Sequence, residues 1–221
     1  MTRILMSERQ EPKSGTVRSM VVFLHGYGAN GLDLLGLAEP LSEHLPDTVF
    51  VAPDAPEEIV GMSSAFQWFP IPWMDGSSEE AAEQGLLASA NDLNAFLDAL
   101  MEEEDLSPEQ VALFGFSQGT MMALHVAPRR PKPVAGVVGF SGRLVAGELL
   151  SDEVASRMPI LLAHGDADDV VPPDSMLEAT QALHAAGFRK VFSHVMKGVG
   201  HGIAPDGLGV ALAFLRDELR F

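Results

Sequence analysis

The pentapeptide Gly115-Phe116-Ser117-Gln118-Gly119 is the stretch of this chain best suited to nucleophilic chemistry. An apolar run typical of a buried strand, residues 111–114, precedes it, and a helix-forming run, residues 120–127, follows it. A strand that turns into a helix through G-x-S-x-G is a nucleophile elbow, in which a sharp turn exposes the serine hydroxyl. The pattern predicts that Ser117 is a nucleophile and that a side chain at position 115 or 119 would collide with neighbouring elements.

A serine hydroxyl needs a base within hydrogen-bond reach, and the chain has seven histidines. His201 lies in a glycine-rich loop, residues 197–202, after the last expected strand. It also completes the chain order serine, aspartate, histidine, which favours it as the base. The remaining histidines are expected inside helices or strands, or directly after strands where structural roles are more common: His25, His44, His125, His164, His184 and His194.

The base needs a carboxylate that orients it. Asp166, Asp168 and Asp169 all lie in one loop after the apolar run 159–163. Turn formation alone explains acidic residues at such a place. Spacing does not choose among the three, so all remain candidates at this point.

The long connection of residues 57–78 contains a cluster of aromatic residues and both tryptophans of the chain. Long ordered loops are often functional, and aromatic side chains commonly line pockets for apolar groups. One interpretation is a substrate pocket lined by Phe66, Trp68, Phe69 and Trp73. The other is that these rings only cover the sheet, and whether the segment acts as a lid also stays open.

Apolar runs of strand length alternate with amphipathic helical stretches along the whole chain. This order predicts an α/β fold with a mostly parallel central sheet and helices on both faces. The runs are residues 20–24, 48–52, 111–114, 134–140, 159–163 and 191–196, with helices expected at 32–41, 77–101, 120–127, 144–156, 173–186 and 208–219. No linker is visible, so residues 1–221 are expected to form one domain, with an edge hairpin within residues 1–20.

The position of the candidate residues supports this topology. Ligands of open α/β sheets bind beyond the carboxyl ends of the strands. Tyr27, Ser117, Asp168 and His201 each follow an expected strand.

Composition limits the function classes. The chain has 31 acidic against 14 basic residues, a formal net charge of −17, which disfavours binding to nucleic acid or to anionic membrane surfaces. It has no cysteine, which excludes disulfides, thiolate zinc sites and a cysteine nucleophile. No apolar run approaches the roughly 18 residues that a membrane span needs, and no export signal is visible. A cytoplasmic location is the expectation.

Five stretches together resemble the phospholipase/carboxylesterase branch of the α/β-hydrolases, which includes acyl-protein thioesterases and small bacterial carboxylesterases. They occur in order over nearly the whole chain, and the G-F-S-Q-G motif combined with H-G-x-x-D-x-x-V-P is a specific pair. The stretches are Phe23–Gly28, Gly115–Gly119, Phe140–Gly142, His164–Pro172 and Gly198–Gly202.

The resemblance implies an α/β-hydrolase fold with Ser117 as nucleophile, Asp168 as orienting carboxylate and His201 as base. It also implies an oxyanion hole formed by the backbone N–H groups of Tyr27 and Gln118. Tyr27 stands where the thioesterases usually have leucine, which leaves the acyl preference open. The aromatic connection is closer to that of bacterial esterases acting on small or aryl esters.

The expected function is therefore a serine carboxylesterase that cleaves small-molecule esters of short or medium acyl groups through an acyl-serine intermediate. Such a mechanism requires no metal and no organic cofactor. An acyl-protein thioesterase or lysophospholipase is the near alternative, and a non-catalytic binding protein on the same scaffold is the remote one. The sequence does not decide whether the protein forms a homodimer.

Overall fold

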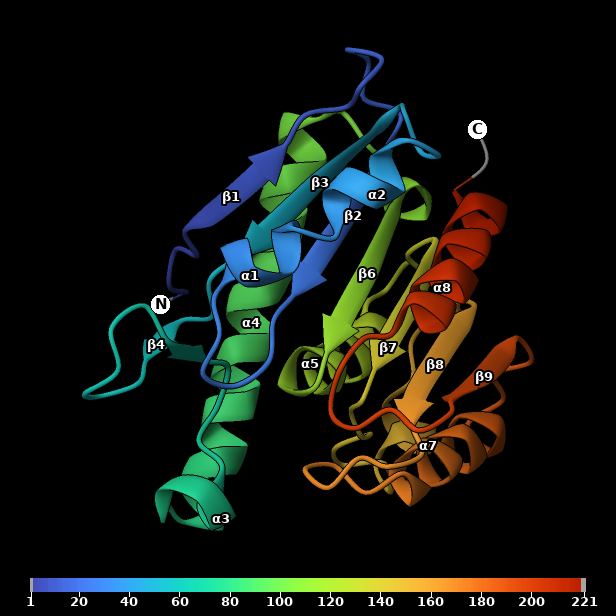
Figure 1. Cartoon of the computed structure of the whole chain (residues 1–221). Helices are drawn as coiled ribbons and strands as arrows, with labels where there is room; N and C mark the ends of the chain where they lie inside the picture. Colours follow the sequence, from blue (N-terminus) through green and yellow to red (C-terminus); the bar gives the residue numbers. More distant parts are fainter. Residues whose placement is uncertain (1, 220–221) are drawn as a thin grey trace.

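A seven-stranded sheet forms the centre of the computed structural model, which describes residues 2–219 (Figure 1). Its strand order is β1-β3-β2-β6-β7-β8-β9. The strands are β1 (Ser7–Gln10), β2 (Ser19–Leu24), β3 (Thr48–Pro53), β6 (Val111–Phe116), β7 (Gly136–Phe140), β8 (Ile160–Gly165) and β9 (Val191–Met196). Only β1 runs antiparallel to its neighbour, and the other neighbouring pairs are parallel. A separate two-stranded sheet joins β4 (Glu57–Glu58) to β5 (Phe66–Gln67).

Helices cover both faces of the sheet, as Figure 1 shows. They are α1 (Gly31–Leu35), α2 (Ala38–Ser42), α3 (Pro72–Asp75), α4 (Glu79–Glu103), α5 (Gln118–Val126), α6 (Leu150–Glu153), α7 (Asp174–Ala185) and α8 (Pro205–Glu218). Short 3₁₀ turns lie at Pro108–Gln110 and Ala127–Arg129. The fold class predicted from the alternating pattern, an α/β-hydrolase arrangement with a mostly parallel sheet, is confirmed.

The residues of β2 show how the two cores arise from one strand. Met20, Val22 and Leu24 pack into the cluster that contains apolar residues of α4, α5 and α7. Val21 and Phe23 point to the opposite face and join residues of α1, α2 and α8. Because side chains alternate along a strand, a strand buried on both faces must be apolar throughout, which is why β2 is a continuous apolar run.

The prediction of an edge hairpin within residues 1–20 is wrong, because the strand in this segment does not pair with the strand that follows it. β1 is an edge strand, but its partner is β3, with Ser7 opposite Pro53. β2 cannot pair with β1, because parallel ladders to β3 and β6 occupy both of its sides.

Two predicted helices are shorter than expected. The stretch 32–41 forms α1 and α2, which are separated at Gly36 and Leu37. The stretch 144–156 contains only α6, because Ala146 has a φ of 51°, which a right-handed helix does not allow. Within residues 2–219, no helix has both the length and the apolar character needed to cross a membrane.

Candidate active site

Ser117 occupies a strained turn between β6 and α5. Its backbone has φ 53° and ψ −116°, a conformation that is rare for a residue with a side chain. A Cβ atom on Gly119 would lie 1.8 Å from the backbone oxygen of Leu24, and one on Gly115 would lie 2.5 Å from the backbone nitrogen of Thr120. The turn therefore has the shape of a nucleophile elbow, and its two glycines are required by the close approach of β2 and α5.

Three side chains from distant points of the chain meet at the carboxyl edge of the sheet. The Nε2 atom of His201 lies 3.0 Å from Ser117 Oγ, and its Nδ1 atom lies 2.8 Å from Asp168 Oδ2. An ionised carboxylate only accepts hydrogen bonds, so the Nδ1–H of His201 donates to Asp168. Nε2 is then free to accept the hydroxyl proton of Ser117, and this arrangement can generate a nucleophilic oxygen.

Asp168 is the only one of the three candidate aspartates that contacts this histidine. Its Oδ1 atom accepts hydrogen bonds from the backbone N–H groups of Val170 and Val171, both at 2.9 Å. Burial raises the pKa of Asp168. Hydrogen bonds from His201 and from these two N–H groups lower it, and together they outweigh the effect of burial, so the pKa of Asp168 lies below its ordinary value. The carboxylate is therefore ionised at neutral pH.

The two neighbouring aspartates have other surroundings. Asp166 accepts a hydrogen bond from the Gly198 backbone and pairs with Lys197 at 3.2 Å. Asp169 is exposed. Of the three aspartates, Asp168 is therefore the one whose side chain lies within hydrogen-bond distance of His201.

Gln118 follows the serine directly in sequence, and Tyr27 follows Gly26, a residue that lies beside the serine. Gly26 packs against Ser117, since a Cβ atom there would lie 3.2 Å from Ser117 Cβ. In the part of the chain that the structure describes, neither the backbone N–H of Tyr27 nor that of Gln118 donates a hydrogen bond. Gln118 is also the first residue of α5, where the helix leaves its N–H groups without intrahelical partners. Both groups are therefore available to bind an oxyanion.

Trp68 does not line a pocket, which corrects one of the four pocket predictions. The residue has no exposed surface. Its indole N–H donates to the His25 backbone oxygen at 3.0 Å, its backbone N–H donates to Gln118 Oε1 at 2.8 Å, and its backbone oxygen accepts from Ser89 Oγ. Trp68 is thus a buried anchor for the aromatic connection, because every polar group that it brings inside has a partner.

Phe66 also lies away from the groove described below. Its backbone oxygen accepts from the Gly28 N–H at 2.9 Å, and its own N–H donates to the Ala29 oxygen at 2.9 Å. The residue therefore fastens the turn that carries Tyr27, a positioning role that sequence reasoning missed.

Phe69 and Trp73 line an apolar cavity of about 360 Å³, here named the aromatic groove. It lies between α3, the start of α4 and the loop that follows β7, and its other apolar walls include Ile71, Leu86, Val145 and Leu149. Two contacts connect the groove wall, or the residue next to it, with the nucleophile elbow. Gln118 Nε2 donates to the Phe69 backbone oxygen at 2.7 Å, and a Cβ atom on Gly142 would lie 2.8 Å from the Ser117 backbone oxygen.

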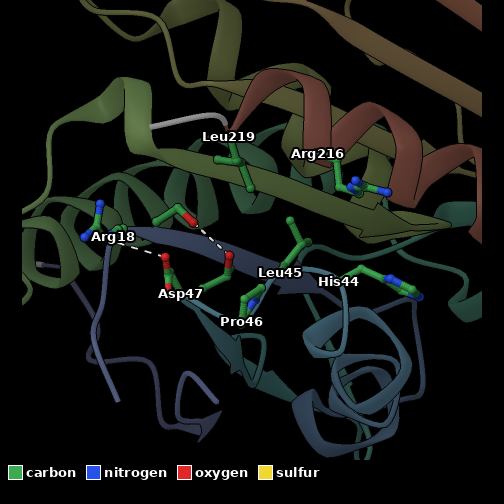
Figure 2. Close-up of a pocket in the computed structure, with 9 residues that line it drawn as sticks. Arg18, His44, Leu45, Pro46, Asp47, Arg216 and Leu219 are labelled. Carbon is green, nitrogen blue, oxygen red and sulfur yellow. Dashed lines mark hydrogen bonds and ion pairs between the residues drawn. The ribbon is translucent and has the colours of Figure 1, made fainter. Parts of the chain in front are cut away.

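A larger cavity of about 480 Å³ lies at the opposite end of the strands (Figure 2). It is bordered by the start of β2, the residues before β3 and the end of α8. Figure 2 shows the ion pair between Arg18 and Asp47, whose charged atoms lie 3.6 Å apart. The hydroxyl groups of Ser19 and Thr48, which also line the cavity, are hydrogen-bonded at 2.8 Å. Ser117, Asp168 and His201 follow the other ends of the strands, so this cavity is not part of the site.

With this geometry established, the comparisons with known proteins identify the family. The family profile described as phospholipase/carboxylesterase matches residues 7–219. The chain belongs to this family. The resemblance deduced from the motifs is therefore confirmed, as is the function class of ester-hydrolysing serine hydrolases.

Two relatives illustrate the range of activities within the family. Acyl-protein thioesterase 1 of Saccharomyces cerevisiae is 30% identical over 224 residues, which cover 96% of this chain and 97% of that protein. A probable carboxylesterase of Oryza sativa is 30% identical over 221 residues, covering 92% of this chain and 79% of that protein. The thioesterase and the probable carboxylesterase are thus similar to this chain at the same sequence identity, 30%.

Solved structures of the family share the fold. The crystal structure of esterase PE8 superposes with a TM-score of 0.92 at 41% identity and covers 98% of this chain and 100% of that one. Acyl-protein thioesterase 2 of Zea mays superposes with a TM-score of 0.78 at 28% identity, covering 97% and 99%. The family fold thus extends over nearly the whole chain.

Two histidines close to the site act through backbone contacts. His25 is buried; its Nε2 atom accepts from the Ala55 N–H at 2.9 Å, and its Nδ1–H donates to the Gly26 oxygen at 2.7 Å. Burial lowers the pKa of His25. His164 Nε2 lies 3.0 Å from the Val171 oxygen and 3.3 Å from Asp168 Oδ2. Their structural role matches the expectation for histidines that end strands. Within residues 2–219, no three histidine or carboxylate side chains are placed to hold a metal ion.

Proposed function

We propose that this protein is a serine carboxylesterase in which Ser117, His201 and Asp168 act as a catalytic triad. The observation that supports this most strongly is the continuous chain of contacts from Ser117 Oγ through His201 to Asp168, at 3.0 and 2.8 Å. Each member follows a different strand at the edge where ligands of such sheets bind.

The proposed reaction has two halves. In the first, His201 Nε2 takes the proton of Ser117 while Oγ attacks the ester carbonyl, and the same proton then passes to the departing alcohol. In the second, His201 takes a proton from water, the resulting hydroxide attacks the acyl-serine, and the proton returns to Ser117 as the acid leaves. Asp168 stabilises the charged imidazole in both halves.

The Tyr27 and Gln118 N–H groups are proposed to bind the negative oxygen of each tetrahedral intermediate. Their freedom from other acceptors and the contact of Gly26 with Ser117 support this assignment. One such donor is worth on the order of 10² to 10³ in rate.

The aromatic groove supports a substrate with an apolar acyl or aryl group. A cavity of about 360 Å³ lies at the small end of the range for ligand pockets, which favours short or medium groups. We therefore propose a small-molecule ester as substrate. The alternative is an acyl-protein thioesterase, which the 30% identity to the yeast enzyme over nearly both full lengths favours, or a lysophospholipase.

A hydrolysis panel separates these functions. Purified protein is assayed with p-nitrophenyl esters of increasing acyl length, with an S-acyl-cysteine peptide and with a lysophospholipid. We expect the highest kcat/KM for the short and medium p-nitrophenyl esters. Turnover of the acylated peptide or of the lysophospholipid alone would contradict the carboxylesterase assignment.

A further inference from the structure

Arg143 has an unusual environment beside the site. It lies in the loop after β7, half-buried, with its guanidinium carbon 4.6 Å from the centre of the Trp73 ring. Its Nε atom is buried without a hydrogen-bond partner. Within residues 2–219, its guanidinium takes part in no hydrogen bond or ion pair with any other residue.

Among residues 2–219, the other arginines that are half-buried or buried are all paired with carboxylates. Arg3 contacts Asp92, Arg9 contacts Glu104, Arg129 contacts Glu153 and Arg130 contacts Asp98. The chain has 31 acidic residues against 14 basic ones, so a lack of carboxylates does not explain the exception. The Nε atoms of Arg9 and Arg130 are also buried without a hydrogen-bond partner, but these side chains pair with carboxylates through their other nitrogens. Arg143 has no such carboxylate among the described residues, and its buried Nε–H is out of reach of solvent, which indicates that a bound ligand supplies an acceptor to this guanidinium.

The position of Arg143 suggests what that acceptor belongs to. Arg143 and Trp73 line the aromatic groove, and the preceding residue, Gly142, packs against the backbone of Ser117. An acyl group attached to Ser117 that runs along the groove would therefore pass the guanidinium. The indole ring holds the guanidinium in place through a cation–π contact and leaves its N–H edge free to donate.

The remaining charges of the groove limit where an anion can bind. Glu79, Glu83 and Glu148 also line it, and all three are exposed. Exposed charges are screened by salt. Arg143 is half-buried and its Nε atom is fully buried, so its charge is screened less than the charges of the three glutamates, although the Trp73 ring beside it is 62% exposed. Among the described residues that line the groove, Arg143 is the basic one, so a substrate carboxylate would bind there.

We propose that Arg143 determines substrate specificity by binding a second carboxyl group on the acyl part, so that the preferred substrates are esters of dicarboxylic acids. This inference rests on the proposed esterase function. An ionised carboxyl accepts two N–H bonds from the guanidinium in parallel, and an esterified one accepts through its carbonyl oxygen. In both forms the acyl group carries an oxygen acceptor that a plain alkyl chain lacks.

Three p-nitrophenyl esters of equal chain length test this proposal: the hexanoate, the adipate half-ester with an ionised carboxyl, and the adipate diester with a methyl-esterified carboxyl. Each is assayed with the wild type and with Arg143→Met, which keeps the length and apolar packing of the side chain and removes its donors. We expect Arg143→Met to lower kcat/KM for at least one adipate ester about tenfold or more relative to the hexanoate, mainly through KM.

Comparing the loss of kcat/KM for the two adipate esters shows whether Arg143 needs a negatively charged carboxylate or only a carbonyl oxygen. Loss for both means that a carbonyl oxygen suffices, and loss for the half-ester alone means that the negative charge is required. An equal change for all three esters would overturn the proposal, because it would indicate a structural role only. Arg143→Lys should recover part of the half-ester activity, and Arg189→Met, at an exposed arginine, serves as the matched control.

A binding measurement separates failure of this inference from failure of the esterase function. Monomethyl adipate is titrated into Ser117→Ala protein by calorimetry, with and without Arg143→Met. We expect binding to weaken about tenfold in the double variant. If the wild type hydrolyses none of the esters, the proposed function fails, but this titration still tests Arg143. Equal affinity of the two proteins would contradict its role.

Discussion

The side chain of Gln118 holds the backbone of Trp68, since its Oε1 atom accepts the Trp68 N–H at 2.8 Å. The same amide donates to the Phe69 oxygen at 2.7 Å. One residue of the nucleophile elbow therefore offers its backbone to the proposed oxyanion hole and its side chain to the floor of the aromatic groove. The geometry of the aromatic groove therefore depends on Gln118, the residue that directly follows the proposed nucleophile Ser117.

We predict that Gln118→Met lowers the free energy of unfolding by about 2 kcal/mol, because it leaves the Trp68 N–H and the Phe69 oxygen buried without partners. Because the Phe69 segment is released, kcat/KM should fall more for p-nitrophenyl hexanoate than for the acetate. Urea unfolding and the two rates check this. Gln84→Met, at an exposed position on α4, is the control. An unchanged hexanoate-to-acetate ratio would argue against the positioning role.

We predict opposite effects of alanine at two helical glycines. Gly119→Ala should destabilise the fold by about 3 kcal/mol or more, because the new Cβ would lie 1.8 Å from the Leu24 oxygen. A Cβ atom added at Gly209 on α8 would meet no neighbouring atom within 4 Å, so Gly209→Ala should stabilise by about 0.5–1 kcal/mol. Thermal melts of both variants check this. Equal melting temperatures would contradict the close packing of the elbow.

We predict that the buried His125 makes the free energy of unfolding depend on pH. Burial, followed by the charge of Arg129, lowers the pKa of His125 to about 4. Between pH 6.5 and about 4 the unfolded chain binds a proton that the folded protein does not, so stability falls as the pH falls through this window. We expect the wild type to lose about 1–2 kcal/mol more than His125→Leu between pH 7.5 and 5 in urea titrations. The exposed His44→Leu serves as control, and parallel titration curves would refute this assignment.

We predict that Asp168→Asn lowers kcat by about 10³- to 10⁴-fold, because an amide no longer fixes the His201 tautomer or stabilises the imidazolium. The lowered pKa of Asp168 also has a consequence for stability: the carboxylate stabilises the fold above its ordinary pKa, and this contribution is lost as the pH falls through the lower folded value. Asp169→Asn, at an exposed position, should retain wild-type activity. Activity of Asp168→Asn within tenfold of wild type would be incompatible with its proposed role.

The sequence predicted the parts of the site that depend on local patterns. Ser117 follows an apolar strand through a glycine-flanked turn, and His201 follows the last strand, so both could be proposed as site residues from their order along the chain. Spacing did not separate Asp168 from Asp166, because both lie in one loop, and only the family resemblance implied Asp168; in the fold, Asp168 contacts His201 whereas Asp166 accepts from the Gly198 backbone. Local spacing carries no information about such a contact.

Contacts between distant residues explain what sequence reasoning missed. Trp68 is buried because Gln118, 50 positions later, satisfies its backbone, and neither residue signals this locally. The proposed role of Arg143 had one signal in the sequence: the residue follows the carboxyl end of β7, the same criterion that selected Tyr27 and His201 as candidates. β1 was misassigned because strand pairing depends on which edge of the sheet is free.

Active-site labelling tests the central claim most directly. The wild type and Ser117→Ala are treated with a fluorophosphonate, and the adduct is counted and located by mass spectrometry. We predict one adduct per wild-type chain, on Ser117, none on the folded Ser117→Ala variant, and a loss of about 10⁶ in kcat for that variant. An adduct on another serine, or ester hydrolysis by Ser117→Ala within tenfold of wild type, would contradict the assignment of the nucleophile.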